Sequence, residues 1–147
     1  MSACLVDSNV WLAAVVGVHL HHDPATGWLS EMDRPAHLVF CRATQQSLLR
    51  LLTNAAVHAP YGLRPLTNGR AWEVVDALMA DDRVVLRADE PAGVDAAWRS
   101  FSARRTASPK LWMDAYLAAF ALAGGYQMVT TDAAFGQFSG LDLRVLG

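Results

Sequence analysis

Three aspartates stand in apolar stretches of this 147-residue sequence, where carboxylates are unusual. Asp7 directly follows the apolar residues 3–6 and is the only charged residue among the first 22. Asp114 is the only charged residue of the stretch 111–131, and Asp132 comes directly after that stretch. Burying a carboxylate costs several kcal/mol unless a cation or ligand compensates its charge. The chemistry of the protein is therefore expected at these three residues.

Alternating strands and helices are predicted to position the aspartates. The length fits one domain, residues 1–147, and the alternation predicts an α/β sandwich with a mostly parallel central sheet flanked by helices. Strands are predicted at residues 3–6, 36–40, 84–86, 127–129 and 141–146, and helices at residues 10–16, 24–32, 42–52, 67–80, 93–104 and 109–123. Residues 54–65, rich in Pro and Gly, are expected to form a loop or irregular segment.

The predicted elements bring the aspartates to one edge of the sheet. Ligands of open parallel sheets bind beyond the carboxyl ends of the strands, where Asp7 and Asp132 are expected. Asp114 joins them if its helix turns one face toward that edge. Clustered carboxylates repel one another, and a divalent cation with a preference for oxygen ligands, Mg²⁺ or Mn²⁺, relieves the repulsion. For each residue alone a structural role stays open: a helix cap for Asp7, a turn for Asp132 and an ion pair for Asp114.

Composition excludes several other classes of protein. The formal net charge of −2 gives no support to a nucleic-acid role, and two cysteines, Cys4 and Cys41, rule out a disulfide scaffold. The longest apolar runs, 10–18 and 115–126, are shorter than the roughly 20 residues of a membrane helix. The N-terminus has no basic residue before Asp7, unlike a signal peptide. We expect a soluble, cytoplasmic protein with no membrane contact.

Other polar and aromatic residues offer weaker signals. His19, His21 and His22 share one segment, for which a solvated loop is favoured over a transition-metal site. Trp112 could stack on a nucleic-acid base or pack in the core. The candidates for contacts with RNA phosphates are Arg42, Arg50, Arg104, Arg105 and Lys110.

Three short segments together resemble the motifs of PIN domains. LVDSNVW at residues 5–11 resembles their opening motif, WMDAYLAAFA at 112–121 the motif around their third acid, and VTTDAAF at 129–135 their closing motif. The order and spacing of the predicted helices match along essentially the whole chain. The likeness extends to VapC toxins, the ribonuclease halves of bacterial toxin–antitoxin pairs.

The resemblance implies a PIN-like three-layer sandwich and a Mg²⁺-dependent endoribonuclease. It makes Asp7 and Asp114 the main metal ligands and lets Asp132 hold a second ion or act through water. It also implies that Asn9 and Thr130 support the site by hydrogen bonds.

The implied partners are RNA, a second copy of the chain in a homodimer, and a cognate antitoxin of the VapB kind. The antitoxin's tail would place a basic side chain among the aspartates. Residues 10–16 and 28–32 would form a groove for its apolar face, unless they face the core.

The sequence departs from the family at one acid. PIN domains usually carry a Glu on the helix after the second strand, and here Gln45 is aligned with it, with Gln46 and Ser47 as alternatives. Because an amide brings no charge, metal binding is expected to be weaker, and the enzyme could be slow or inactive. A degenerate PIN fold that binds RNA or a partner therefore stays open. So does a small metal-dependent phosphatase with Asp7 as nucleophile, although Asn9 stands where that class usually has an Asp.

Overall fold

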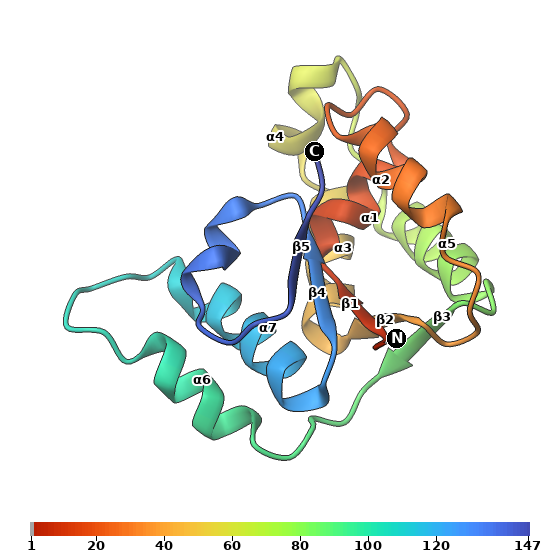
Figure 1. Ribbon diagram of the computed structural model, residues 1–147. Helices are drawn as coiled ribbons and strands as arrows, with labels where there is room; N and C mark the ends of the chain where they lie inside the picture. Colours follow the sequence, from red (N-terminus) through yellow and green to blue (C-terminus); the bar gives the residue numbers. More distant parts are fainter. Residues whose placement is uncertain (1) are drawn as a thin grey trace.

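The computed structural model describes residues 2–147 and contains a five-stranded sheet (Figure 1). The strand order is β3-β2-β1-β4-β5, and each neighbouring pair is parallel. The strands are β1 (Cys4–Val6), β2 (Leu38–Cys41), β3 (Val84–Arg87), β4 (Gln127–Thr130) and β5 (Leu143–Val145). The prediction of a mostly parallel sheet is confirmed.

Seven α-helices and two short 3₁₀ helices form within residues 2–147. They are α1 (Ser8–Val15), α2 (His22–Ser30), α3 (Arg42–Leu52), α4 (Ala55–His58), η1 (Ala59–Tyr61), α5 (Asn68–Met79), α6 (Val94–Ser102), α7 (Leu111–Gly124) and η2 (Ala133–Gln137). None of these helices is long and apolar enough to cross a membrane.

The sheet is the middle layer of three. Side chains alternate along a strand, so Cys4 and Val6 join one core with α1, α2, α3 and α5, while Leu5 joins a second core with α6 and α7. On β2, Phe40 and Val39 divide between the two cores in the same way. The two helical layers lie on opposite sides of the sheet in Figure 1. The predicted three-layer arrangement is therefore present.

The segment 54–65 is not the irregular loop expected from its Pro and Gly content. It contains α4 and η1, because the side chain of Asn54 accepts a hydrogen bond from the N–H of Ala56 and caps α4. Gly62 ends η1 in the left-handed region, with φ of 68°. Pro60 lies in the first turn of η1, where its missing N–H costs nothing.

Helix α2 and the segment before it also differ from expectation. The helix begins at His22, two residues before the expected start at Pro24, which lies in the first turn. His19, His21 and His22 are half-buried rather than solvated. His19 packs against Tyr61 with ring centroids 5.2 Å apart, and His22 Nδ1 lies 2.8 Å from the carbonyl oxygen of Ala13.

The chain reverses its direction of travel across the sheet between β1 and β4. It builds β2 and β3 on one side of β1, then crosses to place β4 on the other side. Such a reversal leaves a crevice at the carboxyl edge, where open α/β sheets bind ligands. Val6 pairs with Val129, and the N–H of Asp7 donates to the carbonyl oxygen of Val129 at 2.8 Å. The residues that end β1 and β4 therefore meet at this edge.

Candidate active site

Asp7 lies buried at the junction of β1 and α1, with 7% of its surface exposed. Its side chain makes no capping hydrogen bond to α1, so the helix-cap alternative does not account for this residue. Instead the hydroxyl of Thr130 donates to Asp7 Oδ2 at 2.8 Å, and Ser8 Oγ donates to Oδ1 at 3.5 Å.

The hydroxyl of Thr130 joins three parts of the site. While it donates to Asp7, it accepts from the N–H of Asp132 at 3.0 Å and from Asn9 Nδ2 at 3.4 Å. One donated and two accepted bonds use the full capacity of a hydroxyl. Asn9 Oδ1 also accepts from the N–H of Thr131 at 3.3 Å, which ties α1 to the end of β4. The structure thus brings together Asn9 and Thr130, the two residues expected to support the site.

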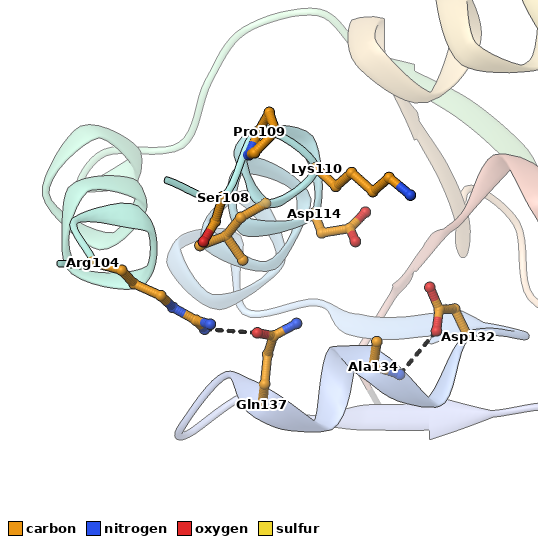
Figure 2. A pocket seen from close by; sticks show the side chains of 9 residues that line it. Arg104, Ser108, Pro109, Lys110, Asp114, Asp132, Ala134 and Gln137 are labelled. Carbon is orange, nitrogen blue, oxygen red and sulfur yellow. Dashed lines mark hydrogen bonds between the residues drawn. The ribbon is translucent and has the colours of Figure 1, made fainter. Parts of the chain in front are cut away.

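Asp114 and Asp132 face one another across a cavity of about 530 Å³ (Figure 2). Asp114 lies in the first turn of α7, and Asp132 follows β4. Asp132 Oδ1 caps η2 by accepting from the N–H of Ala134 at 2.9 Å, and its other oxygen points toward the cavity. The turn role considered for Asp132 is real, but it occupies only one of the two oxygens. The cavity is lined by Arg104, Ser108, Pro109, Lys110, Leu111, Asp114, Asp132, Ala134 and Gln137.

The three carboxylates carry uncompensated charge. Burial raises the pKa of Asp7 to about 6, with smaller upward contributions from Asp114 and Asp132 and opposing hydrogen bonds from Thr130 and Ser8. Burial, followed by the charge of Asp132, also raises the pKa of Asp114. Within residues 2–147, none of the three forms a salt bridge, which excludes the structural ion pair considered for Asp114.

This set of donors fits a divalent cation that prefers oxygen, although the cage is not closed. No group of three or more His, Cys, Asp or Glu side chains in the described part of the chain lies close enough to enclose a metal ion. Asp7 does not line the cavity of Asp114 and Asp132, although the charges of both residues raise its pKa. All three donors are carboxylates that repel one another, which is the chemistry that Mg²⁺ and Mn²⁺ neutralise.

On α3, the structure distinguishes the three candidates for the missing acid. Gln45 is buried, and its amide oxygen accepts a hydrogen bond from Arg42, whereas Gln46 is exposed. Ser47 Oγ lies 2.8 Å from the hydroxyl of Ser8, the neighbour of Asp7. The link from Ser47 to the Asp7 carboxylate was not foreseen, because it depends on how α3 packs against α1.

The candidate RNA-binding cations fall into two groups. Arg104 and Lys110 line the cavity with Asp114 and Asp132, and Arg104 Nη2 donates to Gln137 at 2.6 Å. Arg50 lies at a neighbouring cavity, which Lys110 also lines. Arg42 and Arg105 line neither cavity. Gln137 was missed from the sequence, where nothing indicated that η2 would turn it toward Arg104.

Comparisons with known proteins agree with this fold. The family model for the PIN domain matches residues 4–141. Ribonuclease VapC41 of Mycobacterium tuberculosis is 54% identical over 142 residues, which cover 97% of each chain. Ribonuclease VapC29 of the same organism is 32% identical over 144 residues, covering 97% of this chain and 94% of its own.

Solved structures share the fold at low sequence identity. Mycobacterium tuberculosis VapC20, a Sarcin-Ricin loop cleaving toxin, aligns with a TM-score of 0.68 and 15% identity, covering 99% of this chain and 100% of its own. VapBC2 from Rickettsia felis, bound to a DNA fragment from its promoter, aligns with a TM-score of 0.65 and 11% identity over 99% of both chains.

The chain belongs to the PIN-domain family and, within it, to the VapC ribonuclease toxins of toxin–antitoxin systems. The resemblance seen in the sequence and the ribonuclease class it implied are confirmed. The family is generally metal-dependent.

We expect Asp7→Asn to stabilise the metal-free protein at pH 8. The folded protein keeps the Asp7 proton up to about pH 6, whereas an unfolded Asp loses it near its ordinary pKa of 3.8. The contribution of Asp7 to stability is therefore greatest below the unfolded pKa, falls as pH rises toward 6, and is then level. The pKa shift of Asp7 lowers the unfolding free energy of the wild type by about 3 kcal/mol between low pH and pH 8. Asp7→Asn does not lose this free energy, because its side chain stays neutral.

Denaturant unfolding in EDTA between pH 3 and pH 8 measures this effect. The exposed residue Asp89 supplies the control, because Asp89→Asn should leave the wild-type pH dependence in place. If Asp7→Asn follows the same pH dependence as wild type, Asp7 does not carry a buried charge.

Proposed function

We propose that the protein cleaves RNA phosphodiester bonds with Mg²⁺ or Mn²⁺ held by Asp7 and Asp114, while Asp132 holds a second ion or acts through water. The observation that carries this proposal is a cavity lined by Asp114 and Asp132, whose charges also raise the pKa of Asp7, while none of the three carboxylates forms a salt bridge within residues 2–147. When bound, such an ion supplies the Lewis acidity that activates water and offsets charge on the phosphate.

The protein's own groups orient the substrate and the ligands. Thr130 and Ser8 hold the Asp7 carboxylate in a fixed orientation, and Asn9 fixes Thr130 in turn. Lys110 and Arg104, on the wall of the cavity, are placed to bind the phosphates that flank the scissile bond. The cavity lining contains no histidine, so a histidine base has no place in the proposal.

Asp114→Asn is expected to reduce cleavage of RNA by at least 100-fold while the fold remains intact. The substitution removes a charge from the site but almost no volume, and Asp114 is half-buried and forms no salt bridge within residues 2–147. Cleavage of a labelled RNA in Mg²⁺, with a thermal melt beside it, measures both effects.

Asp76, exposed on α5, provides the matched control, since Asp76→Asn should cleave at the parent rate. Cleavage by Asp114→Asn at the parent rate would refute the site. A parent protein that binds RNA but leaves it uncut in Mg²⁺ and Mn²⁺ would instead favour a degenerate PIN fold.

We propose that position 47 takes the place of the family's Glu. If so, Ser47→Glu should tighten Mn²⁺ binding by about tenfold, equivalent to about 1.4 kcal/mol, because it adds a carboxylate beside Ser8 and Asp7. Gln45→Glu should change the affinity little, because Arg42 already contacts position 45. Titration calorimetry compares the two variants, with Ser47→Ala as the control for loss of the hydroxyl. If only Gln45→Glu binds Mn²⁺ more tightly, position 45 rather than position 47 corresponds to the family's Glu.

We also propose a cytoplasmic antitoxin as the partner. Structural neighbours include the VapBC2 complex, and a free ribonuclease would harm its own cell. A basic residue of the antitoxin would neutralise Asp7, Asp114 and Asp132 and displace their cation.

The groove that we propose for the antitoxin includes the end of the expected segment 10–16, Val15 and Val16. Most of residues 10–16, and Trp28, face the core, which was the alternative to their forming a groove. An apolar cavity of about 420 Å³ lies where α1 ends, between α3 and α5. Its lining consists of Val15, Val16, Gly17, Val18, Leu52, His58, Leu63, Arg64, Leu66 and Val74. This cavity suits the apolar side of an antitoxin segment.

Expression of the chain alone should arrest bacterial growth, and co-expression of an antitoxin encoded beside it should restore growth. Colony counts after induction measure both effects, with Asp114→Asn as the control that folds but does not arrest growth. High-level, harmless expression of folded parent protein in a host without the antitoxin would contradict the toxin role.

A further inference from the structure

A second cavity, of about 700 Å³, lies beside the proposed cleavage site between α3, α6 and α7. We call it the aromatic cavity; its lining is Ala43, Arg50, Trp98, Pro109, Lys110, Trp112, Met113 and Tyr116. We propose that it binds an unpaired base of the RNA substrate against Trp112. The inference rests on the proposed ribonuclease function and adds a binding site for a nucleotide near the scissile bond.

Trp112 is exposed although its helix is apolar on every side. Helix α7 turns Leu111, Ala115 and Ala118 into the core, so the helical period of 3.6 residues sends Trp112 and Met113 outward. Trp112 keeps 58% of its surface exposed. An indole at the surface offers a flat face to any base, independent of sequence.

The aromatic wall is held in place before any ligand binds. Trp98 Nε1 donates to the carbonyl oxygen of Trp112 at 3.0 Å, and the two indoles meet edge to face with centroids 6.4 Å apart. Trp98 also meets Tyr116 edge to face at 5.5 Å, and the Tyr116 hydroxyl donates to Glu90 at 2.6 Å. A ligand therefore loses little free energy to the ordering of these side chains.

The cavity also carries positive charge suited to a nucleic-acid backbone. Arg50 and Lys110 are exposed, and neither forms a salt bridge within residues 2–147. The nearby Asp95 is paired with Arg99 at 2.9 Å. Unpaired cations beside stacking aromatics are the combination that binds single-stranded nucleic acid.

The aromatic cavity borders the acidic site. Pro109 and Lys110 line both cavities, and Lys110 extends on the same side as the Asp114 carboxylate in Figure 2. One RNA strand can therefore place a phosphate near Asp114 and an adjoining base on Trp112. A second copy of this chain is the other occupant to consider. An apolar dimer contact would leave the charges of Arg50 and Lys110 without partners, whereas an RNA backbone would pair with them.

The test measures binding of a short oligouridine and of an abasic oligomer with the same length and charge, by fluorescence anisotropy in EDTA. Trp112→Ala should weaken binding of the oligouridine about tenfold, the order expected for loss of one base stack, and leave binding of the abasic oligomer unchanged. Trp112→Phe should retain most of the affinity, and Trp72→Ala, a control at an exposed Trp on α5, should match the parent.

The salt dependence tests the cations separately. Arg50→Gln and Lys110→Gln should each reduce the slope of log affinity against log salt by about 0.7, with the base and abasic oligomers affected alike. A slope equal to the parent's in both variants would show that these cations do not contact the strand.

Two outcomes overturn the inference. Trp112→Ala could bind oligouridine as tightly as the parent, or sedimentation could show that it breaks a homodimer while its RNA affinity is unchanged. Cleavage by the parent in Mg²⁺ is scored separately. If the parent does not cleave RNA but Trp112→Ala loses base-dependent binding, the base site stands and the proposed function is refuted. If the parent cleaves RNA but Trp112→Ala keeps base-dependent binding, only the base site is refuted.

Discussion

Asp7 carries a carboxylate to a position that water scarcely reaches, and the surrounding site is arranged around that charge. The pairing of β1 with β4 sets Thr130 beside it, and one hydroxyl then holds Asp7 while it orients Asp132 and Asn9. The hydrogen bond from Thr130 lowers the pKa of Asp7, but burial outweighs it and the net pKa is raised. The unrelieved charge is why the metal-free site is unfavourable for folding and favourable for a cation.

Under the proposed function, the two neighbouring cavities divide the recognition of an RNA strand between them. The first is lined by Asp114 and Asp132 together with Arg104 and Lys110, so it holds groups that attract a cation and groups that attract phosphate. The second offers aromatic faces with little negative charge. Helix α7 contributes to both within its first turn, which fixes the spacing between the acids and the aromatic wall. The proposed cleavage and the proposed base binding therefore both depend on the position of one helix.

The fold and the three acids could be predicted because their signals are local. A strand followed by an aspartate, or an apolar helix with one charge, is visible in the sequence alone, and parallel pairing then brings strand ends to one edge. The exposure of Trp112 could not be predicted, because α7 is apolar all round and periodicity cannot tell which face packs on the sheet. The contact between Ser47 and Ser8 was hidden for a similar reason, since it depends on the rotation of α3 against α1.

Anomalous diffraction from crystals grown with Mn²⁺ shows most directly whether Asp7 and Asp114 share a divalent cation. We expect a manganese peak at about 2.1 Å from a carboxylate oxygen of each residue, with Asp132 beside the same ion or a second one. Thr130 should still donate to the other oxygen of Asp7. A well-ordered crystal with no peak at these carboxylates, or with manganese bound only at His19, His21 and His22, would contradict it.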